Sequence, residues 1–190
     1  MSIAQLIRSF SAQPTLPLYL TPIQTYNNPN AYDTSDSDYF GYSVSVDGNY
    51  AIVGAYDEGD AGGTNSGKAY IFDATTGSLL QTLSNPNAYG TSAYDNFGIS
   101  VAISGNLAIV GAFFEGDDSG EIESGKAYIF DATTGSLLHT LSNPNAYGTS
   151  AGDQFGSSVA ISGNLAIIGV PYEDDAGGTN SGKAYVYQLS

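Results

Sequence analysis

The chain repeats itself, and this repetition limits the folds open to it more than any other feature. Residues 66–93 read SGKAYIFDATTGSLLQTLSNPNAYGTSA, and residues 124–151 repeat them with one difference, His139 in place of Gln81. Repetition at intervals of 57 or 58 residues indicates similar units that stack on one another. The markers that keep this register are Phe40-Gly41, Phe97-Gly98 and Phe155-Gly156, together with Gly67-Lys68, Gly125-Lys126 and Gly182-Lys183.

Within a unit, the apolar residues follow the period of two that is typical of β-strands. Residues 100–104 alternate as a half-buried strand does, and residues 107–111 form an unbroken apolar run that is typical of a strand buried on both faces. The Gly105-Asn106 turn between them predicts a hairpin. Residues 126–130 and 136–141 supply two further strands. We therefore expect four antiparallel strands per unit and an all-β fold.

Four short strands per unit, repeated with a linking loop, are typical of sheets arranged radially. The sequence predicts a β-propeller of four-stranded antiparallel blades, three per chain, and an open β array or a sandwich is the alternative. We assign residues 1–20 to an N-terminal anchor segment and linker and residues 21–190 to the propeller domain. The repeats within this domain cover residues 21–77, 78–135 and 136–190.

The markers of each unit resemble the FG-GAP repeats of integrin-type propellers, which have Phe-Gly at the start and Gly-Ala-Pro after the second strand. The resemblance covers residues 23–189. Residues 143–178 also resemble repeats of structural proteins of marine cyanophages. The matching residues are Phe97-Gly98 with Gly111-Ala112, Phe155-Gly156 with Gly169-Val170-Pro171, and Phe40-Gly41 with Gly54-Ala55.

The FG-GAP resemblance implies a calcium site, and this sequence departs from it. The family loop D-x-[DN]-x-[DN]-G-x-x-D offers the closely spaced oxygens that calcium needs. The corresponding turns are too short and too poor in carboxylates, so we assign no metal ligands and leave calcium only as an option for the acidic loops. Those turns are Asp47-Gly48-Asn49, Ser104-Gly105-Asn106 and Ser162-Gly163-Asn164.

Acidic residues gather in loops that should share one edge of the sheets. In an antiparallel four-stranded sheet, the loops after strands two and four emerge at the same edge, and here they hold all but three of the 19 acids. This acidic face could dock a basic protein surface, collect divalent cations, or only keep a glycine-rich protein soluble. Its predicted members are Asp57, Glu58, Asp60, Glu115, Asp117, Asp118, Glu173, Asp174 and Asp175.

The last unit ends after its third strand, at residues 183–190, whereas residues 21–29 align with the fourth strand at 78–86. Propellers commonly close when a terminal strand completes the blade at the other end. Three blades are fewer than the usual range of about four to eight, so we predict that two chains exchange this strand in a six-bladed dimer. Completion by a different protein is the alternative. The predicted contact residues are Ile23, Thr25, Tyr185 and Tyr187.

The first residues of the chain show a different pattern. Ile3, Leu6, Ile7 and Phe10 lie at the spacing of one helical face. This short amphipathic segment is predicted either to anchor the protein to a neighbouring protein or to fold back on the side of the propeller. It lacks the basic start and the uninterrupted apolar core of a signal peptide.

Composition excludes several classes of function. A net charge of -15 disfavours nucleic-acid binding, and the absence of cysteine excludes disulfides and thiol chemistry. No apolar run approaches the roughly 20 residues of a membrane helix, so we expect no membrane insertion. The single histidine, His139, corresponds to glutamine in the other units, and no nucleophile-elbow pattern is present. We therefore expect a protein that is not an enzyme.

Two functions remain in addition to the disfavoured enzyme. The first is a structural component of a phage virion, associated with tail or capsid, bound to other virion proteins through the N-terminal segment and displaying the acidic face. The second is a bacterial extracellular propeller for adhesion or carbohydrate binding. The lack of a secretion signal favours the virion, because virion proteins assemble in the cytosol.

Overall fold

The computed structural model describes residues 21–30, 35–61, 63–86, 92–116, 123–145 and 149–190. Within these ranges, no helix is long and apolar enough to cross a membrane. The regular structure consists of β-strands: β1 (Val44–Asp47), β2 (Tyr50–Ala55), β3 (Lys68–Asp73), β4 (Leu79–Ser84), β5 (Ser100–Ser104), β6 (Leu107–Ala112), β7 (Lys126–Asp131), β8 (Leu137–Ser142), β9 (Ser158–Ser162), β10 (Leu165–Val170) and β11 (Lys183–Gln188).

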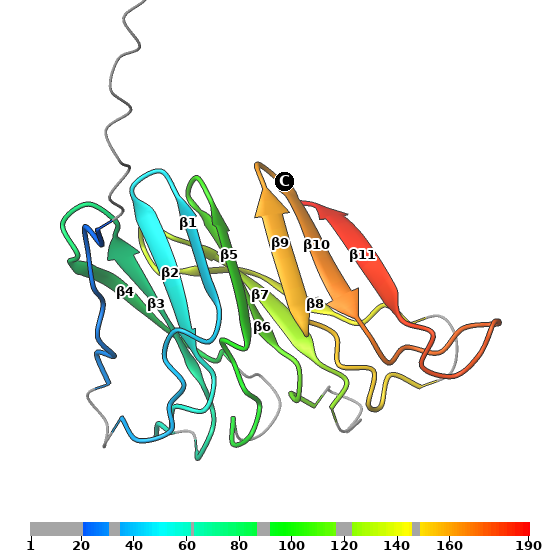
Figure 1. The fold of residues 1–190 in the computed structure, drawn as a ribbon. Coiled ribbons are helices and arrows are strands. Elements are labelled where there is room, and N and C mark those ends of the chain that lie inside the picture. The colour runs from blue at the N-terminus through cyan, green and yellow to red at the C-terminus, as the bar shows by residue number, and fades with distance from the viewer. Residues whose placement is uncertain (1–20, 31–34, 62, 87–91, 117–122, 146–148) are drawn as a thin grey trace, which may run out of the picture.

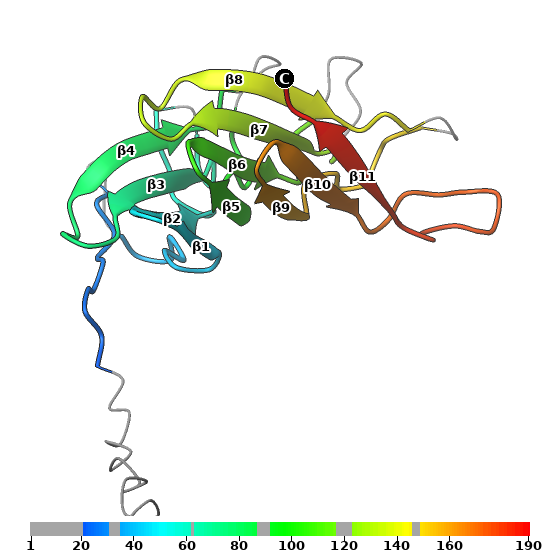
Figure 2. The same ribbon diagram turned by 90° about the horizontal axis from the view of Figure 1, so that it is seen from above.

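The strands form three antiparallel sheets, in each of which neighbours in the chain are neighbours in space. Sheet 1 holds β1 to β4, sheet 2 holds β5 to β8, and sheet 3 holds β9 to β11. The sheets stand side by side in an open arc, with β1, β5 and β9 on its inner side and β4 and β8 on its outer side (Figures 1 and 2). The all-β prediction and the four-stranded blade are confirmed, and the ring is not closed by the described part of one chain.

Each sheet starts with the predicted tight hairpin. The first two strands pair in the same register in every sheet, as in Val44 opposite Val53 and Val101 opposite Val110. The turn glycines Gly48, Gly105 and Gly163 have φ of 54°, 54° and 55°. This left-handed conformation is the one that two-residue hairpin turns require, and glycine adopts it without steric cost.

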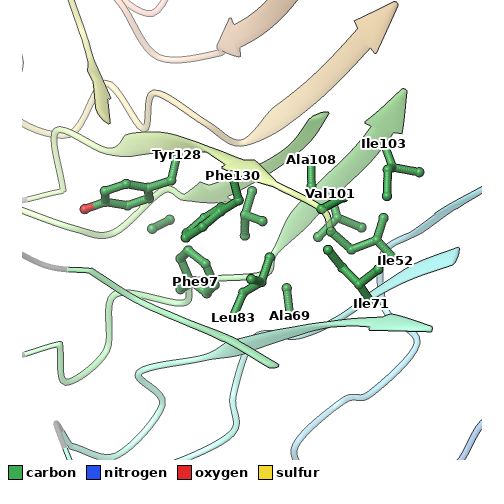
Figure 3. Packing of buried hydrophobic residues seen from close by; sticks show 13 residues of the cluster. Ile52, Ala69, Ile71, Leu83, Phe97, Val101, Ile103, Ala108, Tyr128 and Phe130 are labelled. Carbon is green, nitrogen blue, oxygen red and sulfur yellow. The ribbon is translucent and has the colours of Figure 1, made fainter. Parts of the chain in front are cut away.

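The hydrophobic core lies between the sheets. In the first cluster, side chains of sheets 1 and 2 point toward one another (Figure 3). Ile52 and Ile71 of sheet 1 are 0% exposed there, and Phe97 at the start of sheet 2 is also 0% exposed. A second cluster repeats the arrangement between sheets 2 and 3, with Ile109 and Ile129 in place of Ile52 and Ile71. Each sheet is therefore stabilised mainly by its neighbours.

The Phe-Gly pairs join neighbouring sheets. The Phe97 amide donates a 3.1 Å hydrogen bond to the Ser66 carbonyl oxygen, which belongs to the preceding unit. A Cβ added to Gly98 would overlap the Lys68 carbonyl oxygen, and one added to Gly54 would overlap the Gly98 carbonyl oxygen. The phenylalanine fills the space between the sheets, and the glycines let two backbones approach closely.

Sheet 3 has three strands, as predicted from the alignment of the repeats. Residues 21–30, which align with the missing strand, contain no β-strand in the single chain. They lie at the opposite end of the arc from sheet 3, beside sheet 1 (Figure 1). A strand forms only beside another strand that takes up its backbone hydrogen bonds, and the chain alone does not bring these two edges together.

Candidate functional site

The loops after strands two and four lie at one edge of the arc, opposite the hairpin turns (Figure 1). We call this edge, formed by residues 35–43, 56–61, 63–67, 92–99, 113–116, 123–125, 149–157 and 171–182, the loop edge. Six residues named from the sequence lie outside the described ranges: Ile3, Leu6, Ile7, Phe10, Asp117 and Asp118. Of the predicted contact residues, Ile23 is 84% exposed, whereas Tyr185 and Tyr187 are half-buried against Phe155.

Three glutamates of the predicted acidic face are buried inside their loops. Glu58, Glu115 and Glu173 are 1%, 1% and 0% exposed. Tyr70 donates a 2.6 Å hydrogen bond to Oε1 of Glu58, and Tyr185 donates one of 2.6 Å to Oε1 of Glu173. Tyr128 donates to Glu115 in the same way. The expectation that these three carboxylates are displayed is therefore corrected: they tie the loop after strand two to the third strand of the sheet.

The second oxygen of each glutamate has an unusual environment. Oε2 of Glu58, Glu115 and Glu173 is buried and has no hydrogen-bond partner. Burial is the largest effect on Glu58 and Glu115, and it raises the pKa of Glu58 to about 6 and that of Glu115 to about 7. The nearby Asp95 carboxylate raises the pKa of Glu115 further, whereas the hydrogen bond from Tyr128 lowers it. A buried carboxylate without full pairing favours the protonated form.

Each of the three repeat-related lysines binds a polar side chain near its own sheet. Lys183 donates a 2.6 Å hydrogen bond to Oε1 of Glu173. Lys68 forms an ion pair with Asp60, and Lys126 donates a 3.0 Å hydrogen bond to Oγ of Ser142. Lys68, at the start of β3, therefore neutralises Asp60, which adds little negative charge to the surface.

The loops after strand four are fastened by a repeated pair of an aspartate and an asparagine. Asp38 accepts a 2.6 Å hydrogen bond from the Asn28 amide, and Asn85–Asp95 and Asn143–Asp153 repeat it at 2.8 and 2.7 Å. The three aspartates are 4%, 5% and 4% exposed. Most acids of the loop edge thus hold loops in place.

The other described members of the acidic face are only partly exposed. Asp57 accepts a 3.0 Å hydrogen bond from the Asn96 side chain. Asp174 and Asp175 each accept a bond from a backbone amide of their own loop, at 2.7 and 2.6 Å. Their carboxylates reach the surface, but the face is less acidic than its composition indicates.

The hairpin turns opposite the loop edge do not fit calcium. Asp47 accepts a 2.7 Å hydrogen bond from the Gly105 amide, and Ser104 accepts one of 3.0 Å from the Gly163 amide. These side chains therefore bind the turn of the next sheet. Calcium takes six to eight oxygen ligands, and the part of the chain that the structure describes contains no group of three acids, histidines or cysteines able to hold a metal.

An aromatic groove opens at the loop edge between sheets 1 and 2, with a volume of about 680 Å³. The Tyr42 and Tyr56 rings are 4.7 Å apart, and the Phe113 and Phe114 rings stack at 3.9 Å. Tyr42 and Tyr94 are each 62% exposed. We define the aromatic groove by Tyr42, Tyr56, Tyr94, Phe113 and Phe114.

No sequence motif predicts this groove, although the sequence holds a signal for it. Its residues stand where the units differ: Tyr94 corresponds to Gly152, and Phe113 corresponds to Pro171. The framework strands are almost unchanged between units, so positions that diverge within the same loops are candidates for specific contacts.

The only histidine lies away from the loop edge. His139 is exposed on β8, opposite Ile129 of β7. Among the described residues, no carboxylate or hydroxyl forms a hydrogen bond with His139 that would orient it for acid–base chemistry. Its strand, β8, is the outer strand of sheet 2, and His139 does not line the aromatic groove.

Comparison with protein families gives matches in all three units. The family model described as FG-GAP repeat matches residues 30–72, 87–130 and 145–187, which together make up more than half of the chain. The search of curated proteins returns no match. The matched stretches contain the three Phe-Gly pairs that join the sheets.

Proposed function

Because this chain belongs to the FG-GAP repeat family, whose repeats imply an interaction or adhesion role, we propose that it is a non-enzymatic protein that binds a partner protein through the aromatic groove. The observation that carries the proposal is the gathering of exposed aromatic rings at one junction of an otherwise regular repeat. Tyrosine and phenylalanine are enriched at the centres of protein interfaces, because they bury large areas and lose little side-chain entropy.

The groove also limits the chemistry of the partner. Asp57 and Glu123 lie among its lining residues, and the chain has a net charge of -15. A partner segment with arginine or lysine can stack its cation on the tyrosine rings and approach these carboxylates. We therefore propose a basic segment of the partner as the element that enters the groove.

Further, we propose that the partner assembly is a phage virion. In this proposal the chain is a tail- or capsid-associated component that other virion proteins bind through residues 1–20 and through the aromatic groove, with the partly exposed Asp174 and Asp175 facing outward. The support is the resemblance of residues 143–178 to repeats of cyanophage structural proteins.

The test compares purified virus particles with the bacterial envelope and the culture supernatant by mass spectrometry. We expect the chain in the particles. In phage carrying Tyr94→Ala together with Phe114→Ala, the amount in particles should fall at least tenfold if the groove holds the chain there. Tyr172→Ala is the matched control, because Tyr172 is a 47% exposed aromatic residue at the loop edge of sheet 3, outside the groove. Absence from particles would overturn the virion proposal.

A second candidate function is supported by the same groove. Aromatic faces are also good surfaces for the apolar faces of sugar rings, and shallow clefts with a few polar groups bind small ligands. An extracellular carbohydrate-binding or adhesion role would place the chain in the envelope or supernatant. Binding to a glycan array that Tyr94→Ala abolishes and Tyr172→Ala keeps would establish this alternative.

A further inference from the structure

The free face of sheet 3 has the composition of an internal interface. Ile109 and Ile129 of sheet 2 are 0% exposed because sheet 3 covers them. Their counterparts in sheet 3 are Ile167 and Val186, which lie opposite each other on β10 and β11 and are 42% and 63% exposed. No described residue of the single chain covers them.

The free face of sheet 1 shows the complementary pattern. Val101 and Ile103 on β5 are 5% and 4% exposed because they pack against sheet 1. Their counterparts on β1 are Val44 and Val46, at 64% and 67% exposed. The free face of sheet 1 is therefore of the kind that packs on a preceding sheet. The free face of sheet 3 is of the kind that packs on a following sheet.

The backbone at the free face of sheet 1 is prepared for the same contact. Gly41 has φ of 93°, close to the 94° of Gly98 and the 92° of Gly156. A Cβ on Gly98 or Gly156 would overlap a carbonyl oxygen of the preceding sheet, whereas a Cβ on Gly41 would have nothing within 4 Å. Phe40 is only half-buried, although Phe97 and Phe155 are 0% exposed.

Residues 21–30 already lie where the fourth strand of a preceding sheet would lie. Gln81 of β4 donates a 2.8 Å hydrogen bond to the Thr133 carbonyl oxygen of sheet 2, and Gln24 donates one of 2.7 Å to the Thr75 carbonyl oxygen of sheet 1. Tyr26, the counterpart of Leu83, packs on Phe72 with ring centroids 4.6 Å apart. The segment thus reproduces the contacts of a fourth strand, and the described residues do not supply the other three strands of such a sheet.

A hollow of about 510 Å³ remains between this segment and sheet 1. Ile23, Tyr26, Val44 and Val46 line it. In the cluster between sheets 1 and 2, Ile52 and Ile71 of the preceding sheet take the equivalent place. The residues equivalent to these two in sheet 3 are Ile167 and Val186.

We infer that sheet 3 of one chain packs on sheet 1 of a second copy and takes residues 21–27 of that copy as its fourth strand. Two copies then make two identical head-to-tail contacts and close a ring of six blades, within the usual range of about four to eight. Ile71 lies opposite Gln81 and Tyr70 opposite Thr82 between β3 and β4. The same register places Val186 opposite Gln24 of the partner subunit, and Tyr185 opposite Thr25 of the partner subunit.

The occupant is a second copy because the chain carries both halves of the contact in the register of its own internal interfaces. A different protein would need Phe-Gly and fourth-strand features of the same kind. The inference is independent of the aromatic groove, which lies between sheets 1 and 2 of a single chain, so either proposal can fail without the other.

The first test is mass in solution, measured by light scattering after size exclusion. We expect the chain to form a species of twice 19.7 kDa. Val186→Asp should raise the dissociation constant at least about 100-fold, because it places an unpaired charge in an apolar interface. Leu138→Asp is the control, since Leu138 is 46% exposed on β8 of the central sheet and should leave the dimer intact. A monomer, or an open series of higher oligomers, would overturn the inference.

Mixing two variants separates a head-to-tail contact from a symmetric one. Val186→Asp damages the face of sheet 3, and Val46→Asp damages the face of sheet 1. Each variant alone should be monomeric, whereas their mixture should form a heterodimer through the one contact in which both faces are intact. If only Val186→Asp dissociates the dimer and Val46→Asp has no effect, the two copies pair by identical faces and the inference is wrong.

A disulfide tests the strand exchange and its register, and the natural chain has no cysteine to interfere. Opposite residues of paired antiparallel strands have Cβ atoms about 4.5–5.5 Å apart, within reach of a disulfide with small adjustment. The double variant Val186→Cys with Gln24→Cys should give covalent dimers on mild oxidation. Val186→Cys with Thr25→Cys should not, because neighbouring strand residues point to opposite faces. Cross-linking of the second pair alone would refute the register.

Discussion

Sheets 2 and 3 have nearly the same sequence and very different surroundings. Ile109 in sheet 2 is fully buried, and Ile167 at the same position in sheet 3 is 42% exposed. Both residues sit at the same point of the same hairpin register. The difference shows that burial in this protein depends on the neighbouring sheet, because the local sequence and the local strand pairing are shared.

The ends of the arc also differ from those of stable repeat arrays. Such arrays usually end in units with a polar outer face, because each unit otherwise leaves an apolar surface in water. Here Val44 and Val46 at one end and Ile167 and Val186 at the other remain apolar and exposed. The exposed faces of sheets 1 and 3 therefore have the apolar composition of faces that are buried between internal units.

The largest expected effect comes from shortening the same side chain in the two sheets. Ile109→Ala should lower the free energy of unfolding by about 2–5 kcal/mol, because it leaves a cavity in a closed interface. Ile167→Ala should lower it by less than about 1 kcal/mol when the free face stays in water. Both changes are made in a chain that also carries Val46→Asp, which prevents a second copy from covering sheet 3, and urea unfolding measures the result.

Equal costs at the two positions would contradict this comparison. They would mean that the face of sheet 3 is covered in solution even when the contact with Val46 is broken. In the chain without Val46→Asp, the inferred dimer predicts that Ile167→Ala becomes costly, and this cost should grow with protein concentration.

The next effect in size is pH dependence from the buried glutamates. Glu115 has a pKa of about 7 in the fold against an ordinary value of 4.5. Between these values the folded chain binds more protons than the unfolded chain, so stability falls as pH rises through this window. At about 1.4 kcal/mol per pKa unit, the unfolding free energy should be higher at pH 5 than at pH 8 by on the order of 2–3 kcal/mol from this group.

The glutamine variant isolates this contribution. Glu115→Gln keeps an oxygen that can accept the Tyr128 hydrogen bond and has no charge to bury, so its stability should change much less between pH 5 and pH 8. Below about pH 4 the trend reverses, because hydrogen bonds from its own turn lower the pKa of Asp73 to about 2, and protonation removes them. An unchanged slope in Glu115→Gln would refute the assignment.

A smaller difference is expected from the glycines that bring neighbouring sheets together. A Cβ on Gly111 would overlap the Gly156 backbone carbonyl oxygen, whereas a Cβ on Gly169 would overlap only the movable Ser158 hydroxyl of its own sheet. Gly111→Ala should therefore cost about 1–3 kcal/mol in the Val46→Asp chain, and Gly169→Ala clearly less. In the chain that can dimerise, Gly169→Ala should also weaken association. Thermal unfolding and sedimentation together measure both effects.

Much of the fold could be predicted from the sequence, because period-two patterning and turn glycines are local signals. Residues 100–104 and 107–111 became β5 and β6 with only one residue added. The missing strand of sheet 3 followed from aligning residues 21–29 with 78–86. The absence of a strand at 21–30 in the single chain could not be predicted in this way, because it depends on which edges meet.

The candidate site was harder to predict for the same reason. Composition placed Glu58, Glu115 and Glu173 in loops, and loop acids are normally solvated. Their burial depends on the tyrosine of the third strand reaching back to the loop, which is a contact between segments distant in sequence. The aromatic groove likewise forms from Tyr42 and Phe113 of two different units.

The smallest effect that distinguishes the two environments is one hydrogen bond between turns. Ser104 of sheet 2 accepts a 3.0 Å bond from the Gly163 amide of sheet 3, and Ser162 is its counterpart at the free end. Ser104→Ala should cost about 0.5–1.5 kcal/mol, the net contribution of a typical hydrogen bond, and Ser162→Ala in the Val46→Asp chain should be close to neutral. In the dimer, Ser162 would accept from Gly48 of the partner subunit, so Ser162→Ala should raise the dissociation constant severalfold. A Ser162→Ala dimer as tight as the unaltered one would show that the turns at this contact do not meet as they do within the chain.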